Sequence, residues 1–163
     1  MITKIIDLII TNIGEQAIVR LEEEHLQPVL VIRVDNLVET AFLLRDTEGY
    51  YFDFLSNISA VDYFPEQRFG VVYHLASIPY QTQLTLKVEM ENDRQLDNLP
   101  EVPSVSTVWR TADWHEREAF DLMGIFFTGH PDLRRILLPD DWQGYPLRKD
   151  YEDADTYHGI AIK

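Results

Sequence analysis

Apolar and polar residues alternate along this chain with two different periods, and each period predicts a different kind of element. Near the N-terminus, isoleucines recur at helical spacing, which predicts a helix over residues 2–13 that ends at Gly14. The polar face of this segment carries only one basic residue, Lys4. The pattern therefore favours packing in a protein core over lying on a membrane surface.

Several runs have the composition and alternation of strands. β-Branched residues predict strands at 17–21 and 29–34, and an aromatic, apolar run predicts another at 52–62. Two longer runs, at residues 69–77 and 82–90, flank a short turn-forming segment. The second of them alternates apolar and polar residues, as a half-buried strand does. These two runs predict a long hairpin.

Two further segments have helical spacing. Residues 36–45 follow Asp35, which can cap a helix, and residues 114–123 follow Asp113, which can do the same. Glu116 stands three positions after Asp113, so the second segment has the spacing of a capping box. The sequence therefore predicts a helix in each segment.

Beyond Gly124, glycines and prolines interrupt regular structure every few residues. The whole pattern predicts an α+β fold: a two-layer, mixed β-sheet with helices on one face, followed by an extended, turn-rich C-terminal tail. We expect one α+β domain over residues 1–124 and a tail over residues 125–163 that packs on partner subunits, because such a tail buries little surface by itself.

The chain is strongly acidic. Its 163 residues include 28 Asp and Glu against 14 Lys and Arg, so the formal net charge is −14. Nucleic-acid-binding proteins need Lys and Arg to displace counterions, and anionic membranes attract the same residues. The charge therefore indicates no nucleic acid partner and no charge-driven docking on a membrane. An apolar content of 45% is typical of a globular domain.

The chain contains no cysteine. It therefore has no disulfide, no thiolate nucleophile, and no cysteine ligands for zinc or an iron–sulfur cluster. No apolar run approaches the roughly 20 residues of a membrane-spanning helix. The N-terminal segment is interrupted by Asp7 and resembles neither a secretion signal nor a transit peptide.

Three carboxylates of the last predicted helix are candidates for chemistry on this chain. His115 and Glu116 resemble the start of a helical zinc motif, but Ala119 stands where that motif needs its second histidine. Glu116, Glu118 and Asp121, together with His115, could serve as general acids or bases of a hydrolase or lyase. The alternative, which we favour, is a structural role in which they pair with nearby arginines.

Charge is distributed unevenly along the sequence. Residues 113–149 contain seven acidic and five basic residues, so this stretch is nearly balanced while the rest of the chain is acidic. Four of its bases are arginines, and the stretch is rich in aromatic residues. Arginine and aromatic side chains are enriched at protein interfaces. The stretch is therefore a candidate partner-binding surface. The alternative, which composition leaves open, is a hydrophobic core that falls late in the sequence.

The last third also carries a long and specific set of motifs. It reads EREAFDLMGI over residues 116–125, GHPDLRRIL over 129–137, PDDW over 139–142 and GYPLRKDY over 144–151. These motifs resemble the 30 kDa subunit of respiratory complex I, called the C subunit in the bacterial NADH:quinone oxidoreductase and the J subunit in chloroplasts. Weaker similarity before residue 109 extends the resemblance over most of the chain.

The resemblance implies a structural subunit of the peripheral arm that carries no cofactor of its own. In this family the protein packs on the hydrogenase-derived 49 kDa-type subunit and near the small iron–sulfur subunit, and these neighbours form the quinone site. We therefore expect a hetero-oligomer in which other chains hold the FMN and the iron–sulfur clusters. We expect no catalytic, cofactor-binding or metal-binding residue on this chain.

The residues expected to form the interface or define the fold lie in the same motifs. The charged helix face is expected to be ion-paired, the glycine to let the chain leave the helix, and the later residues to fix the tail and anchor it on its partner. The set is Trp114, Glu116, Arg117, Glu118, Asp121, Gly124, His130, Pro131, Arg134, Arg135, Trp142, Tyr145, Arg148, Lys149 and Tyr151.

The parent reaction oxidises NADH, reduces quinone and pumps protons. Related subunits serve membrane-bound hydrogenases and other quinone or ferredoxin oxidoreductases, and the sequence leaves that alternative open. The chain ends soon after Tyr151 and has no basic presequence. We therefore expect a free-standing subunit, peripheral on the cytoplasmic side of the bacterial plasma (inner) membrane.

Overall fold

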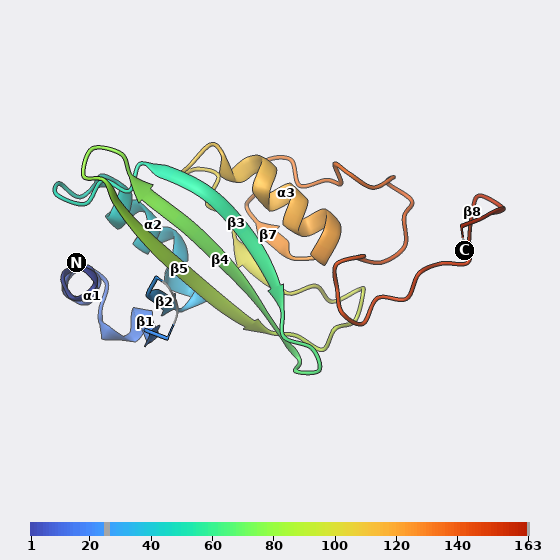
Figure 1. Ribbon diagram of the computed structural model, residues 1–163, viewed down its shortest axis with the longest axis horizontal. Helices are drawn as coiled ribbons and strands as arrows, with labels where there is room; N and C mark the ends of the chain where they lie inside the picture. Colours follow the sequence, from blue (N-terminus) through green and yellow to red (C-terminus); the bar gives the residue numbers. More distant parts are fainter. Residues whose placement is uncertain (25–26, 163) are drawn as a thin grey trace.

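The computed structural model describes residues 1–24 and 27–162. Five strands form one mixed sheet in the order β1-β2-β5-β4-β3 (Figure 1). Neighbouring strands run antiparallel except β2 and β5, which are parallel. The elements are α1 (Ile2–Asn12), β1 (Ile18–Glu22), β2 (Val29–Ile32), α2 (Leu37–Asp46), β3 (Phe54–Asp62), β4 (Arg68–Ser77), β5 (Thr82–Glu91), β6 (Glu101–Pro103), α3 (Ala112–Met123), β7 (Phe126–Thr128), β8 (Thr156–Tyr157) and β9 (Ile160–Ala161).

The predicted long hairpin is confirmed, and it forms the centre of the sheet. β4 and β5 pair without interruption from Arg68 opposite Glu91 to Ser77 opposite Thr82. Alternate side chains of the two strands are buried on one face: Phe69, Val71, Tyr73, Leu75, Leu84, Leu86, Val88 and Met90. This alternation follows from the two-residue period of a strand.

The helices cover that same face, as the sequence predicted. Ile5 and Ile9 of α1 are fully buried in one core cluster with the inward side chains of the sheet, α2 and α3. The other face carries an ion-pair network instead. There Arg20 bridges Glu22 and Glu89, while Lys87 contacts both carboxylates.

Two predicted helix caps are wrong. Asp35 lies in a short 3-10 turn, and α2 begins at Leu37 without a side-chain hydrogen bond at its N-cap. α3 begins at Ala112, two residues earlier than predicted, with Thr111 at its N-cap and again no side-chain cap. Glu116 is therefore inside the helix and forms no capping box.

The segment after Gly124 starts as part of the domain. β7 pairs in parallel with β6, so that α3 connects two short parallel strands. Ile125 and Phe127 are buried in the core. The folded core thus extends past residue 124, where the sequence predicted its boundary.

The remainder of the tail runs along α3 and away from the sheet. Figure 1 shows it as the orange-to-red trace, with the C-terminus and the N-terminus at opposite ends of the molecule. It contains only the short β8–β9 pair as regular structure among the described residues.

Candidate partner-binding site

The predicted interface residues of α3 lie on different faces of the helix. Ala112, Glu116, Ala119 and Met123 follow one another at helical spacing and are all buried. Glu118 is exposed, so it does not share the buried environment of the other charged residues. Sequence reasoning placed Glu116 at a helix end, but its spacing from Ala112 and Ala119 is the signal that assigns it to the apolar stripe.

Glu116 is a fully buried carboxylate held by neutral donors. Its side chain accepts hydrogen bonds from the Ser104 hydroxyl at 2.6 Å and from the Val105 backbone N–H at 2.7 Å. Burial raises the pKa of Glu116 to about 7, although these two hydrogen bonds oppose the shift. The carboxylate ties the chain after β6 to α3.

The adjacent Arg117 pairs with other acids. Its guanidinium lies 2.8 Å from Asp113 on the same helix and 3.0 Å from Asp132 in the tail. It also stacks on the Trp114 ring, 5.0 Å from the ring centroid. Arg117 therefore fastens the start of the tail to the first turns of α3.

The side chain of His130 is buried between α3 and the tail. Its Nδ1 accepts the backbone N–H of Asp132 at 3.0 Å, so the ring proton is on Nε2 while that bond is made. Nε2 lies 3.1 Å from the Asp113 carbonyl oxygen and 3.9 Å from the Glu116 carboxylate. The exposed Pro131 follows directly. His130 thus fixes the turn that leads out of β7.

Asp121 is the main anchor for the middle of the tail. Its Oδ2 accepts the backbone N–H groups of Ile136, Leu137 and Leu138 at 3.0, 2.6 and 3.0 Å. Its Oδ1 pairs with the Arg135 guanidinium at 2.8 Å. Burial alone would raise the pKa of Asp121, but these hydrogen bonds outweigh it and lower the pKa below the ordinary value.

Arg135 continues this connection along the tail. Its Nη2 donates to the carbonyl oxygens of Trp142 at 3.2 Å and Gly144 at 2.9 Å. The guanidinium also lies over the Tyr145 ring, 5.1 Å from the centroid. One arginine therefore joins α3 to two later turns. By contrast, Arg134 is exposed and pairs with Asp132 at 3.1 Å.

Gly124 and Arg148 close the far end of α3. Gly124 ends the helix with φ +70°, a left-handed conformation that glycine adopts without strain. A Cβ at this position would lie 2.6 Å from the Tyr145 ring and 2.8 Å from Arg148. The buried Arg148 donates to the Met123 carbonyl at 2.8 Å and stacks between the rings of Phe69 and Tyr145. Burial lowers its pKa.

A third buried carboxylate, Asp62 at the end of β3, was missed from the sequence. It pairs with Arg94 at 2.7 Å and accepts the backbone N–H of Lys149 at 2.8 Å. Arg94 in turn pairs with Asp150 at 2.7 Å. The only sequence signal is an acid at an inward position of a strand, and nothing local indicates its distant partners.

The remaining predicted residues lie farther along the tail. The Trp142 ring packs 5.3 Å from that of Tyr157. The half-buried Tyr151 lies beside Gly144, and Lys149 is exposed. Three large apolar side chains close to α3 are exposed: Trp114 at 63%, Leu137 at 62% and Leu147 at 58%. We call these three the α3 apolar set.

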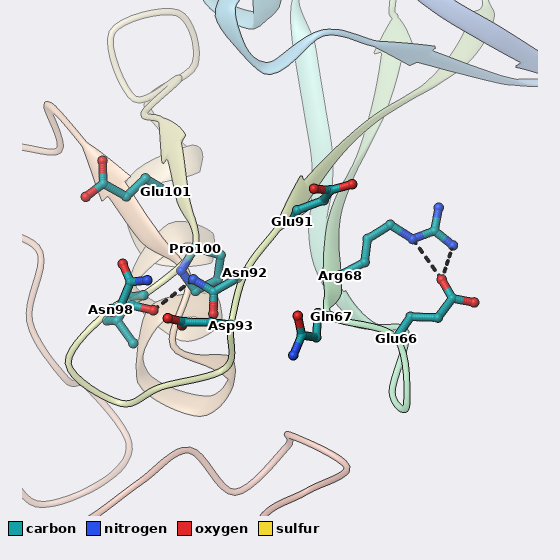
Figure 2. A pocket seen from close by; sticks show the side chains of 10 residues that line it. Glu66, Gln67, Arg68, Glu91, Asn92, Asp93, Asn98, Pro100 and Glu101 are labelled. Atoms are coloured by element: carbon teal, nitrogen blue, oxygen red, sulfur yellow. Dashed lines mark hydrogen bonds and ion pairs between the residues drawn. The ribbon is translucent and has the colours of Figure 1, made fainter.

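A separate hollow lies between the open end of the β4–β5 hairpin, where β4 begins and β5 ends, and the loop before β6 (Figure 2). It is a cleft of about 960 Å³ that includes none of the predicted interface residues. Its lining is mostly polar, with four acidic residues and one basic residue: Glu66, Gln67, Arg68, Glu91, Asn92, Asp93, Asn98, Leu99, Pro100 and Glu101. Figure 2 shows Arg68 turned toward Glu66.

Within the described residues, no group of three or more histidine or acidic side chains is arranged to hold a metal ion. No helix in residues 1–24 and 27–162 has the length and apolar character needed to cross a membrane. The charged side chains Glu116, Arg117 and Asp121 of α3 are instead occupied with contacts to the chain itself.

A family model described as the respiratory-chain NADH dehydrogenase 30 kDa subunit matches residues 30–157. The chain belongs to this family. The C subunit of the NADH-quinone oxidoreductase of Chloroherpeton thalassium is 45% identical over 148 residues, which cover 90% of this chain and 59% of that protein. The corresponding protein of Moorella thermoacetica is 48% identical over 124 residues, covering 76% of this chain and 79% of that protein.

A solved structure shares the fold. One chain of the membrane-bound sulfane sulfur reductase, an archaeal respiratory membrane complex, superposes with a TM-score of 0.73 over 92% of this chain and 85% of that one. Its sequence identity is 22%. The α+β architecture predicted from the sequence is therefore confirmed, and it is shared with this chain of the archaeal complex.

Proposed function

We propose that the chain is a cofactor-free structural subunit of the peripheral arm of a proton-pumping NADH:quinone oxidoreductase. In this role it braces the 49 kDa-type quinone-site subunit and the small iron–sulfur subunit. The FMN and iron–sulfur clusters belong to other chains, which carry electrons from NADH to quinone. We place the subunit on the cytoplasmic side of the bacterial inner membrane, without a membrane span of its own.

The observation that carries this proposal is a fixed tail with exposed apolar side chains. Asp121 holds three consecutive backbone N–H groups of the tail, and Leu137 is the second of those three residues. Leu147 is fixed nearby, because its backbone N–H donates to the Leu122 carbonyl at 2.9 Å. Trp114 stands on the helix itself. A surface that is already ordered loses little conformational entropy when a partner covers it.

Family membership supports the choice of partners. The relatives at 45% and 48% identity are both named as a subunit of NADH-quinone oxidoreductase. The nearly balanced charge of residues 113–149 also suits an interface, because its acids and arginines are largely paired within the chain. The remainder of the chain carries the surplus of negative charge.

Substitutions in the α3 apolar set test this proposal in the native complex. Leu137→Asp and Leu147→Asp place a charge on the surface that the partner would bury. We expect each to reduce the amount of this protein that co-purifies with the complex, and to reduce NADH:quinone activity in proportion. Ile78→Asp is the matched control, since Ile78 is 63% exposed at the β4–β5 turn, at the other end of the sheet. Full retention of both leucine variants would refute the proposal.

The same purification distinguishes the alternative parent complex. A flavin-containing, NADH-binding subunit among the co-purifying chains supports the NADH:quinone oxidoreductase. If the co-purifying chains are instead the subunits of a membrane-bound hydrogenase, or of another quinone or ferredoxin oxidoreductase, the proposed bracing role would stand but the reaction of the complex would be different.

A further inference from the structure

Glu116 is a buried acid whose direct hydrogen-bond partners are neutral. These partners are the Ser104 hydroxyl and the Val105 backbone N–H. The neighbouring Arg117 points to Asp113 and Asp132 instead. Transferring an ionised carboxylate from water to such a site is unfavourable, and neutral donors offset only part of this desolvation free energy. The protonated acid is therefore favoured over the ionised form.

The hydrogen bonds around Glu116 can accommodate either form. The Ser104 hydroxyl lies 2.6 Å from Glu116 Oε2 and 2.8 Å from the Ser106 hydroxyl, and either serine can be the donor in the second contact. With Glu116 ionised, Ser104 donates to it. With Glu116 protonated, the acid donates to Ser104, which then donates to Ser106. Ser106 is half-buried, so the two hydroxyls lead from the carboxylate toward the surface.

The other charged and titratable groups facing this site come from three directions. On α3, Asp113 raises the pKa of Glu116 through its negative charge. From β4, Tyr73 is fully buried and its pKa is raised, first by burial and then by the charge of Glu116. From the tail, His130 Nε2 lies 3.9 Å from the Glu116 carboxylate.

We propose that Glu116, with the Ser104–Ser106 hydroxyl pair and His130 next to the same carboxylate oxygen, is a buried proton-binding site that exchanges with solvent through the hydroxyl pair. The ligand is a single proton, taken from water and bound on the carboxylate oxygen that faces Ser104. This site lies within the chain, so the proposal is independent of which complex the subunit joins.

The site couples proton binding to the packing of β6, α3 and β7. The pKa of Glu116 is raised from 4.5 to about 7 in the folded chain. Between these two values the folded state holds a proton that the unfolded state has released. The contribution to stability is therefore fully present below pH 4.5 and is lost as the pH rises through about 7. In that window the unfolding constant rises up to about tenfold per pH unit.

Glu116→Gln in the full chain tests the site, with Glu118→Gln as the matched control two residues away on the same helix. We expect Glu116→Gln to remove up to one proton from the pH dependence of urea unfolding between about pH 5 and about pH 7, and Glu118→Gln to leave it unchanged. Infrared difference spectra of the wild-type chain should show a buried carboxylic acid that ionises near neutral pH. That band should be absent in Glu116→Gln.

Ser106→Ala tests the route without touching the carboxylate. We expect the infrared midpoint to stay near that of the wild type and the relaxation after a pH jump to slow. An unchanged relaxation would overturn the route through the hydroxyl pair. A wild-type spectrum in which every carboxyl ionises below about pH 5 would overturn the site itself, even if Glu116→Gln fails to fold.

Discussion

Asp121 offers the sharpest test of how the tail is held. Replacing it with asparagine keeps the size of the side chain and one oxygen, which can still face the three backbone N–H groups of residues 136–138. The other oxygen, Oδ1, lies 2.8 Å from Arg135 Nη1 in the wild-type chain. In the variant an amide NH₂ takes its place and points at the guanidinium. The substitution therefore removes a charge and sets two donors against each other.

The magnitude follows from burial and from the number of contacts. Asp121 is fully buried, and the Arg135 side chain is 12% exposed. Removing one partner from a buried ion pair reduces stability by about 3–5 kcal/mol. Arg135 keeps its bonds to the Trp142 and Gly144 carbonyls, which favours the lower end. We expect a loss of about 3 kcal/mol, roughly a 150-fold increase in the unfolding constant.

Urea denaturation of the full chain measures this loss, and hydrogen exchange locates it. The amides of residues 136–138 should lose protection in Asp121→Asn, while the amides of the β4–β5 hairpin change less. Asp140→Asn is the control, because Asp140 is an exposed acid in the same tail. If Asp121→Asn loses less than about 1 kcal/mol, as the control is expected to do, the ion pair and its amide contacts do not hold the tail and the reasoning is refuted.

Two further predictions concern the same region. Gly124→Ala should lower stability by about 1–3 kcal/mol, because alanine at φ +70° is strained and its Cβ would lie 2.6 Å from the Tyr145 ring; thermal unfolding measures the loss, and an unchanged melting temperature contradicts it. Asp62 and Asp121 both have lowered pKa values, because hydrogen bonds to each carboxylate outweigh the effect of burial. At Asp62 these bonds come from Arg94 and backbone N–H groups, and at Asp121 they come from backbone N–H groups and the Arg135 guanidinium. Their contribution to the stability of the folded chain is present above pH 3.8, the ordinary pKa of an aspartate, and is lost as the pH falls below that value. Urea unfolding should therefore show a lower stability at about pH 3 than at about pH 5, and equal stability at the two pH values would contradict the prediction.

Elements with a regular period could be predicted from the sequence. The isoleucine stripe of α1 and the alternation along β4 and β5 each repeat many times, so one odd residue does not change the interpretation. These repeats also determine which side chains are buried, and Ile5, Ile9, Leu84 and Leu86 all lie in the core. The position of the helices on one face follows from the same apolar surface.

Single residues that depart from a period were harder to interpret. A polar side chain at an apolar position can be a helix cap, a surface residue or a buried acid. Glu116 was assigned to a helix cap, but it is a buried acid. Its true environment depends on Ser104 and Val105, which precede the helix and approach it only because β6 pairs with β7. No local pattern contains that information.

The tail could be recognised as irregular, but its contacts could not be predicted. Its backbone N–H groups are satisfied by carboxylates from distant elements, as with Asp121 and the three amides of residues 136–138. Asp62 and Lys149 are separated by 87 positions. Such pairings have no period, so sequence reasoning identified the residue types of the candidate site without their partners.

The contact between Asp62 and the Lys149 backbone has a consequence for biosynthesis. Asp62 belongs to the edge strand of the sheet, whereas Lys149 is synthesised 87 positions later. Until then the Asp62 carboxylate lacks one of its hydrogen-bond donors, although Arg94 is already available. Contacts of such large sequence separation form late in folding. A chain stopped before residue 149 would therefore lack this contact, and we expect it to be more susceptible to proteolysis than the full chain.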